Sequence, residues 1–598
     1  MKISSINLFS IVIILCFGII VYSNSYYCPF HFDDFPSIVN NSFIRNIYHL
    51  HSIWHSLPRR FILYLSIAFN YHFNGKEVFG YHLFNLGVHL GAAILVWWLI
   101  LLTFLTPAIK EEKIAQHANI IALLAGLVFV VHPIQTEAVT YIVQRAASMA
   151  TLFYLASLCF YVQSRLLVNK GGGYYILSII MAAMAMFTKE TAITLPLMIL
   201  FYEFSFLKNK QPFNWSAVFP FLLTMSFIPV TMLFTETGAV RMHELRSEPC
   251  ISSMHYFLTQ LRVMVTYIRL IFLPLHQNLD YDYPISKTIF EAPTIISLFF
   301  LITILYLAKS LFLKYRVLSF SIFWFFLTLL PESSFLPIKD VIFEHRLYLP
   351  LVGYSVFLVS GLYYLLGKNT IGMMIVLAMI ITGYSVLTYE RNKVWKDEYT
   401  LWNDVIRQSP NKARAYLNRG CAFYNQGNFD KSVSDYNKAI QLKTDVNVVY
   451  YVQGCILDKQ GNFTKAIADY NQAIKLDPKN VDAYYNRGNV YYKQGNFAQA
   501  ILDYNEAIVL NPNNEDEYNN RGLAYSKQGN FIKAISDYNK AIELNPKDVD
   551  AYQNRAISYY KLKEYDKFLV DVHNTEELRC PFNAKYLNKL KTEAGIGK

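Results

Sequence analysis

Two adjacent acids, Asp33 and Asp34, are the residues whose type and placement best fit chemistry. They follow an apolar run at 8–22 by a short loop, and Glu77 is the only other carboxylate among the first 110 residues. A charge close to hydrocarbon is costly and tends to be kept for function. The pair therefore predicts chemistry where the outer surface of a membrane protein meets water.

Composition divides the chain into an apolar and a polar half. Of its 598 residues, 54% are hydrophobic and 16% are charged. Apolar runs of spanning length recur up to about residue 389, whereas the chain beyond 391 is polar and contains none. The net charge of +11 fits positive inner loops and a solvated polar surface, which argues against nucleic-acid binding.

The apolar half predicts an all-α membrane domain at 1–390, built as a polytopic bundle of about eleven spans. Two further apolar stretches, 59–73 and 256–275, carry arginines and are predicted to lie on the membrane surface instead. The predicted spans are 6–23, 81–105, 118–133, 148–168, 172–187, 191–206, 213–236, 291–313, 316–331, 346–366 and 369–388.

Loop charge predicts a cytoplasmic N-terminus, because the short loops that then face inward carry lysine and arginine. The outward loops are long, at 24–80 and 237–290, with a shorter one at 332–345. Polar groups at membrane depth usually line a cavity, so we expect the outward clusters to converge there; pairing between helix ends is the alternative. These clusters are Asp33–Asp34, 132–145, Lys189–Glu190, 241–282 and Glu344–Arg346.

The polar half contains five copies of one motif between 411 and 580, followed by a tail at 581–598. Its small residues Gly420, Gly454, Gly488 and Gly522 stand 34 residues apart, which is the tetratricopeptide period of two helices per repeat. Stacked copies form an α-solenoid with a concave groove. The segment 391–410 joins the halves without a flexible linker, and its apolar pattern predicts an amphipathic helix that caps the solenoid.

A row of asparagines recurs on the first helix of the repeats. Such a row can hold an extended acceptor peptide through its backbone amides. The alternative is that asparagine is ordinary consensus at this position. The residues are Asn418, Asn486, Asn520 and Asn554.

Several ordered motifs resemble the transmembrane and tetratricopeptide-repeat O-mannosyltransferases (the TMTC family) and related bacterial membrane glycosyltransferases. They include "HFDDFPSIVNN" at 31–41, "FGYHLFNLGVHL" at 79–90 and "VHPIQTEAVTYIVQRAASMATLFYL" at 131–155. "FTKETAITLP" and "EHRLYLPLVGY" are similar to two later blocks of that family. One departure is Ser148, which stands where the family commonly has an acid.

The resemblance implies an inverting glycosyltransferase of the GT-C type, which uses a polyprenyl- or dolichyl-phosphate-linked sugar, mannose-like in this family, on the non-cytoplasmic face. Asp33 or Asp34 would be the base toward an acceptor hydroxyl of protein Ser or Thr, and the leaving phosphate would need cationic help. Glu137, Glu190 and Glu344 would support the site, and we expect no metal or other cofactor. The expected phosphate-binding residues are Arg59, His132, Arg145, Lys189, Arg262, Arg269, His345 and Arg346.

Two other functions fit parts of the sequence. A membrane-anchored scaffold would use the repeats to recruit protein partners and the spans as an anchor. A transporter would need broken helices or a paired internal repeat, and the span region displays neither. The glycosyltransferase hypothesis places the site and the repeats on the non-cytoplasmic side of the membrane. This is the outer face of a bacterial plasma membrane or the lumen of the endoplasmic reticulum.

Overall fold

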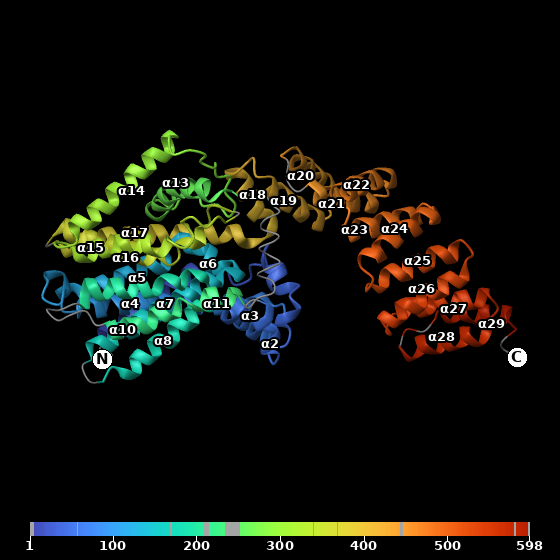
Figure 1. Ribbon diagram of the computed structural model, residues 1–598, viewed down its shortest axis with the longest axis horizontal. Coiled ribbons are helices and arrows are strands. Elements are labelled where there is room, and N and C mark those ends of the chain that lie inside the picture. The colour runs from blue at the N-terminus through green and yellow to red at the C-terminus, as the bar shows by residue number, and fades with distance from the viewer. Residues whose placement is uncertain are drawn as a thin grey trace. The chain divides into compact units, whose positions relative to one another are not determined.

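The computed structural model is helical throughout its described residues, and no strand occurs among them (Figure 1). It divides into two compact units, Met1–Pro410 and Asn411–Lys598. The all-α prediction is therefore confirmed. The structure describes residues 5–56, 58–167, 170–207, 215–233, 251–338, 340–367, 369–442, 446–578, 580 and 582–595.

The first unit is a bundle of apolar helices around a large buried core. Short helical turns lie between several of the long helices. The helices are α1 (Ser5–Val21), α2 (Leu50–Ser56), α3 (Phe61–Asn74), α4 (Val78–Phe104), α5 (Ala118–Val131), α6 (Thr136–Thr140), α7 (Arg145–Leu166), α8 (Gly172–Met186), α9 (Leu195–Tyr202), α10 (Trp215–Thr224), α11 (Phe227–Leu233), α13 (Ser253–Phe272), α14 (Ala292–Leu311), α15 (Arg316–Leu329), α16 (Pro350–Leu366), α17 (Thr370–Asn392) and α18 (Glu398–Gln408).

The described helices agree with the predicted spans. Six are long and apolar enough to cross a bilayer, and five further apolar helices are shorter. Each lies on one of the predicted spans, whereas α3, which follows Arg59 and Arg60, and α13, which contains Arg262 and Arg269, are not among them. The six are Val78–Phe104, Lys113–Val131, Ile142–Leu166, Glu190–Leu207, Ala292–Leu311 and Thr370–Lys396. Of the predicted outer loop 237–290, residues 237–250 lie outside the described part of the chain.

The connecting segment packs inside the first unit. The Nδ1 atom of His31 lies 2.9 Å from the Glu398 carboxylate, and its Nε2 atom lies 2.8 Å from the Trp395 carbonyl oxygen. The Trp402 ring meets the Phe32 ring edge-on, at 5.6 Å between centroids. The Trp402 side chain on the apolar face of α18 therefore packs on the loop that follows α1, and the cap on the repeats stays a prediction.

The second unit is a tandem array of helix pairs, as the 34-residue period predicts. Its helices are α19 (Ala413–Asn425), α20 (Phe429–Gln441), α21 (Val446–Lys459), α22 (Phe463–Leu476), α23 (Val481–Lys493), α24 (Phe497–Leu510), α25 (Glu515–Lys527), α26 (Phe531–Leu544), α27 (Val549–Lys561), α28 (Tyr565–Glu577) and α29 (Ala584–Glu593).

The repeated glycines are required by a tyrosine on the second helix of each pair. A Cβ atom on Gly420 would lie 2.7 Å from Cε1 of Tyr436, which is closer than packed carbon atoms approach. The same contact recurs in the next three repeats. In the fifth repeat, Ala556 replaces the glycine and Val572 replaces the tyrosine. The larger residue on the first helix is thus matched by a smaller residue on the second helix.

Buried ion pairs join the two helices of a repeat and link neighbouring repeats. Arg487 makes two hydrogen bonds to Asp503, at 2.8 and 2.6 Å, and a third to Asn471 of the preceding repeat at 2.5 Å. Equivalent Arg–Asp pairs are Arg419–Asp435, Arg521–Asp537 and Arg555–Asp571. A bidentate guanidinium–carboxylate pair fixes geometry as well as charge, so the arginines set how the repeats stack.

The second repeat interrupts this series. Gln453 replaces the arginine and donates to Asn437 at 2.9 Å, and burial raises the pKa of the facing Asp469 to about 6. Because Asp469 binds its proton more tightly folded than unfolded, its contribution to stability is lost as the pH rises from about 4 to about 6.

Gln453→Arg is expected to restore the pair with Asp469 and to raise the free energy of unfolding by about 1 kcal/mol at pH 7. A paired arginine lowers the pKa of the carboxylate that it meets, so the gain should be larger at pH 7 than at pH 5. Amide hydrogen exchange of helices α21 to α23 in the full chain measures this. A gain that is equal at both pH values would exclude pairing as its cause.

Candidate functional site

Asp34 is a fully buried acid that fastens the loop after α1 to the segment before α7. Its Oδ2 atom accepts the His31 backbone N–H at 2.9 Å, and its Oδ1 atom accepts that of Val143 at 2.8 Å. Burial raises the pKa of Asp34 to about 7, although the two N–H bonds and the nearby Arg145 act in the opposite direction. Asp34 is thus held on both oxygens and has no exposed surface.

Asp33 has a different environment, because its side chain is only half-buried. Its backbone N–H donates to the Tyr141 hydroxyl at 2.7 Å, and the Tyr141 ring stacks on Trp395 at 5.4 Å between centroids. The sequence left open which of the two acids is the base. Of the pair, Asp33 can be reached by a substrate, whereas Asp34 is enclosed.

The segment from Thr136 to Gln144 connects these acids to a second polar group. Glu137, at its start, lies 2.6 Å from Nδ1 of His345 and accepts the His345 backbone N–H at 3.0 Å. Burial raises the pKa of Glu137 to about 7 and holds that of His345 well below its ordinary value. Tyr141 and Val143, which contact Asp33 and Asp34, follow Glu137 in the same short segment of the chain.

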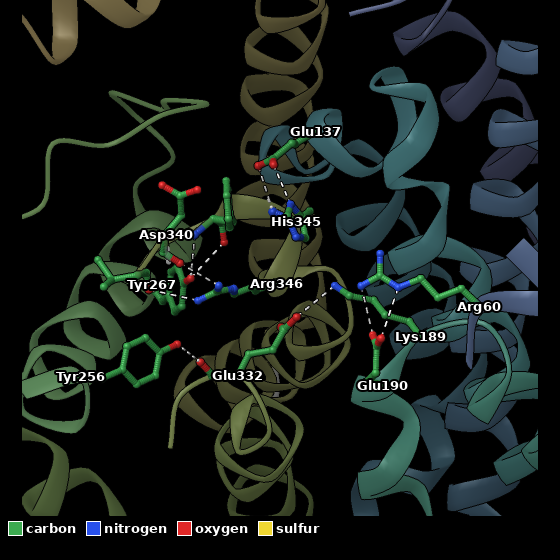
Figure 2. Close-up of polar contacts among 12 residues, drawn as sticks. Arg60, Glu137, Lys189, Glu190, Tyr256, Tyr267, Glu332, Asp340, His345 and Arg346 are labelled. Atoms are coloured by element: carbon green, nitrogen blue, oxygen red, sulfur yellow. Dashed lines mark hydrogen bonds and ion pairs between the residues drawn. The ribbon is translucent and has the colours of Figure 1, made fainter. Parts of the chain in front are cut away.

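A cationic cluster, formed by Arg59, Arg60, Lys189 and Arg346, lies beside His345. Figure 2 shows Lys189 and Glu190, neighbours in the chain, pointing to different partners. Nζ of Lys189 is 3.1 Å from the Glu332 carboxylate. The Glu190 carboxylate is 3.3 Å from Arg59 and 3.2 Å from Arg60.

Backbone contacts position the cluster. The N–H of Ile62, at the start of α3, donates to the Phe187 carbonyl oxygen at 3.0 Å, which brings the two arginines before α3 to the end of α8. The Arg346 guanidinium donates to the carbonyl oxygens of Val341 and Asp340 at 3.0 Å each (Figure 2). Lys189 and Arg346 both act on the charge of Glu332, so four separate segments meet here.

Two members of this group were missed at the sequence level as site residues. Arg60 was noted only as a charge on a surface helix, and Glu332 was not considered. The signal for Glu332 was present, because it is an acid placed directly after the apolar run 316–331, as Asp33 follows 8–22.

His132 and Arg145 are fully buried outside the cationic cluster. Nδ1 of His132 accepts the Ile134 backbone N–H at 3.2 Å, and its Nε2 atom donates to the Ile271 carbonyl oxygen at 2.9 Å. The His132 side chain thus caps the helical turn Pro133–Gln135. Arg145 donates to the Asn70 side chain at 2.5 Å beneath the first loop, and Ser148 donates to its carbonyl oxygen at 3.1 Å.

Arg262 and Arg269, on α13, brace the loop that follows this helix. Arg262 donates to the Ser286 hydroxyl at 3.1 Å, and Arg269 donates to the Leu275 carbonyl oxygen at 3.0 Å. Glu344 holds the same loop from the other side, since it accepts the Asn278 backbone N–H and the Tyr281 hydroxyl, both at 2.6 Å. Burial raises the pKa of Glu344 to about 7. The structure therefore does not bring Arg262 and Arg269 to Lys189.

The asparagine row lies between successive repeats. Asn486 and Asn520 donate to the hydroxyls of Tyr451 and Tyr485 in the preceding repeat, at 3.0 and 2.7 Å. Asn554 donates to Asn519 at 3.1 Å. Asn418 begins the row, and its buried Nδ2 atom has no partner among the described residues. Each side chain is half-buried, so the row borders an accessible surface.

Comparison with known proteins agrees with both units. Models of the TPR repeat match residues 454–495 and 488–529, and models of the tetratricopeptide repeat match 413–444, 515–548 and 537–567. A solved structure with a similar fold is MamA 41-end from Desulfovibrio magneticus RS-1, at 20% identity over 28% of this chain and 95% of that one, with a TM-score of 0.27.

Similarity to curated proteins extends into the membrane unit. Protein O-mannosyl-transferase Tmtc3 of Drosophila melanogaster is 25% identical over 525 residues, which are 73% of this chain and 56% of the relative. Protein O-mannosyl-transferase TMTC3 of Homo sapiens is 24% identical over 74% of this chain and 52% of its own. The chain thus spans about half the length of these relatives. It is a membrane protein with tetratricopeptide repeats that is homologous to the TMTC protein O-mannosyl-transferases.

Proposed function

We propose that the chain is an inverting membrane glycosyltransferase. It transfers a hexose, mannose-like in view of its relatives' names, from a polyprenyl- or dolichyl-phosphate donor to a hydroxyl of protein Ser or Thr. The site faces the non-cytoplasmic side. The observation that carries this proposal is the placement of one reachable acid, Asp33, against the segment whose start, Glu137, contacts His345 beside the cationic cluster.

In the proposed step, the Asp33 carboxylate takes the proton of the acceptor hydroxyl as the oxygen attacks the anomeric carbon. The new carbon–oxygen bond forms on the face opposite the donor phosphate. The bond between the anomeric carbon and the phosphate oxygen breaks, and its electron pair leaves with the lipid phosphate. A base placed beside the hydroxyl at this moment contributes about 10²–10⁴-fold in rate. Asp34 holds the loop that carries Asp33.

The cationic cluster supplies what the leaving phosphate needs. Four cations, Arg59, Arg60, Lys189 and Arg346, face two acids, Glu190 and Glu332, so positive charge is in excess. Fixed cations in a water-poor site stabilise developing negative charge without reorganising. The proposed step draws on these side chains and on no metal ion.

The repeats are proposed to hold the acceptor as an extended segment. The Nδ2 atoms of Asn486, Asn520 and Asn554 are used between repeats, and no described residue donates to their Oδ1 atoms. These oxygens can therefore accept backbone N–H groups of a bound peptide, at a spacing of one repeat.

The test uses the full chain in lipid nanodiscs with polyprenyl-phosphate mannose and an unstructured peptide rich in serine and threonine. We expect the peptide mass to rise by one hexose and an equal amount of polyprenyl phosphate to be released. The repeats could instead bind the peptide while no lipid phosphate is released from mannose or glucose donors. That result would contradict the proposed transferase activity and favour a membrane-anchored scaffold.

A further inference from the structure

One carboxylate occupies the centre of the cationic cluster. Glu332 lies 3.1 Å from Lys189, and Arg346, His345 and Arg60 are close enough to act on its charge. Its side chain is only 15% exposed and that of Lys189 only 8%. Burial alone would raise the pKa of Glu332, but Lys189 and Arg346 hold it below its ordinary value, so the acid is ionised at neutral pH.

The two acids of the cluster are held differently. Glu190 stands at the start of a helical turn and meets Arg59 and Arg60; Figure 2 shows its contact with Arg60. Glu332 stands in a stretch without regular helix, and among the residues that the structure describes its side chain forms an ion pair with Lys189 alone. The Tyr256 hydroxyl donates to the Glu332 carbonyl oxygen at 2.6 Å, which anchors the backbone and leaves the carboxylate to turn about its own side-chain bonds.

A carboxylate and a phosphate present similar oxygens to a guanidinium or an ammonium group. An ionised acid that sits between Lys189 and Arg346 therefore has the position and the charge that a phosphate oxygen would take in the same cluster. An empty cationic cluster would also repel itself, and Glu332 reduces that repulsion while no ligand is bound.

We propose that Glu332 is a resident anion that lipid phosphate displaces from Lys189. This inference rests on the proposed function, because it takes the cationic cluster as the donor-phosphate site. Glu332 is a positioning residue: it keeps Lys189 and Arg346 in place between turnovers, and it exchanges with the phosphate when the donor binds. The exchange weakens donor binding, since the phosphate competes with an internal carboxylate at high effective concentration.

The test measures binding of farnesyl phosphate to the full chain in detergent, with farnesol as the uncharged control and inorganic phosphate as a second arm. Removing one negative charge from the cluster, in Glu332→Gln, is expected to lower the Kd for farnesyl phosphate by roughly tenfold. Glu332→Asp keeps the charge and should stay within about twofold of the wild type. The KM for the donor should fall in parallel with the Kd.

The matched control is Glu203→Gln, which removes another buried acid of the same unit. Glu203 lies 2.8 Å from Arg165, near the end of α7 away from Arg145, and should leave the Kd unchanged. A second measurement uses only the wild type, so it remains informative if Glu332→Gln does not fold. Hydrogen exchange at 330–338 should become faster when farnesyl phosphate is added, because Glu332 then leaves Lys189.

The outcomes separate this inference from the proposed function. In one outcome, the wild type binds farnesyl phosphate while Glu332→Gln binds it no tighter and hydrogen exchange at 330–338 stays unchanged. In that case the proposal of a resident anion is wrong, whereas the proposed donor site stands. If neither protein binds farnesyl phosphate, both proposals fail. If Glu332→Gln lowered the Kd for inorganic phosphate but not the Kd for farnesyl phosphate, the proposal that a lipid phosphate displaces Glu332 would be wrong.

Discussion

Asp33→Asn is expected to lower kcat for sugar transfer by about 10³-fold, because an amide cannot take the proton of the acceptor hydroxyl. The substitution keeps the size of the side chain. It also keeps the contact of the residue 33 backbone N–H with Tyr141, so folding and membrane insertion should be unchanged. Initial rates with polyprenyl-phosphate mannose, beside a thermal melt of the same preparation, measure the two effects separately.

Asp34→Asn is the matched control. The amide would present N–H groups to one of the two backbone donors, His31 and Val143, that now meet the carboxylate. A buried donor left without an acceptor costs about 1–3 kcal/mol, so this variant should lose stability first. The opposite pattern, an active Asp33→Asn beside a stable but inactive Asp34→Asn, would assign the base to Asp34.

Lys189→Met is expected to lower kcat/KM by about 10²–10³-fold, because it removes a fixed cation from the leaving phosphate. Methionine keeps the apolar stem in a site where Lys189 is buried. Arg346 remains beside Glu332 in this variant, so the acid keeps one cationic neighbour. Transfer rates measured at several donor concentrations separate a loss of binding from a loss of turnover.

Arg262→Met serves as the comparison, since Arg262 braces the loop after α13 and lies outside the cationic cluster. It should retain most of the activity. Equal losses in the two variants would mean that the phosphate contacts Arg262 as well, and that the loop after α13 moves on donor binding.

Elements whose pattern is local were predictable from the sequence. The spans are continuous apolar runs, and the regular spacing of Gly420 and its copies indicates the repeats. Candidate site residues such as Asp33 and Lys189 were predictable because charge is rare in this half of the chain. The partners of these residues were not predictable. Lys189 pairs with Glu332, and Glu137 with His345, although more than a hundred residues separate the members of each pair, and only the packing of the helices brings them together.

The connecting helix α18 shows the same limit. Its amphipathic pattern correctly predicts a helix with one covered face, but a pattern does not say which unit covers it. The contact of His31 with Glu398 joins residues 367 positions apart, and it depends on how the first loop folds back. Arg262 and Arg269 illustrate the converse, because their charge fits a phosphate site although their hydrogen bonds serve a nearby loop.

The third and fourth repeats each contain a glycine, the tyrosine that packs on it and an arginine, Arg487 or Arg521, that reaches the repeat before it. A duplicated copy of such a repeat would therefore fit between its neighbours without further substitutions. The fifth repeat, with Ala556 and Val572, would fit less well in the interior. Gene duplication can thus lengthen this array in whole units, and the length of acceptor chain that it engages would then change in equal steps.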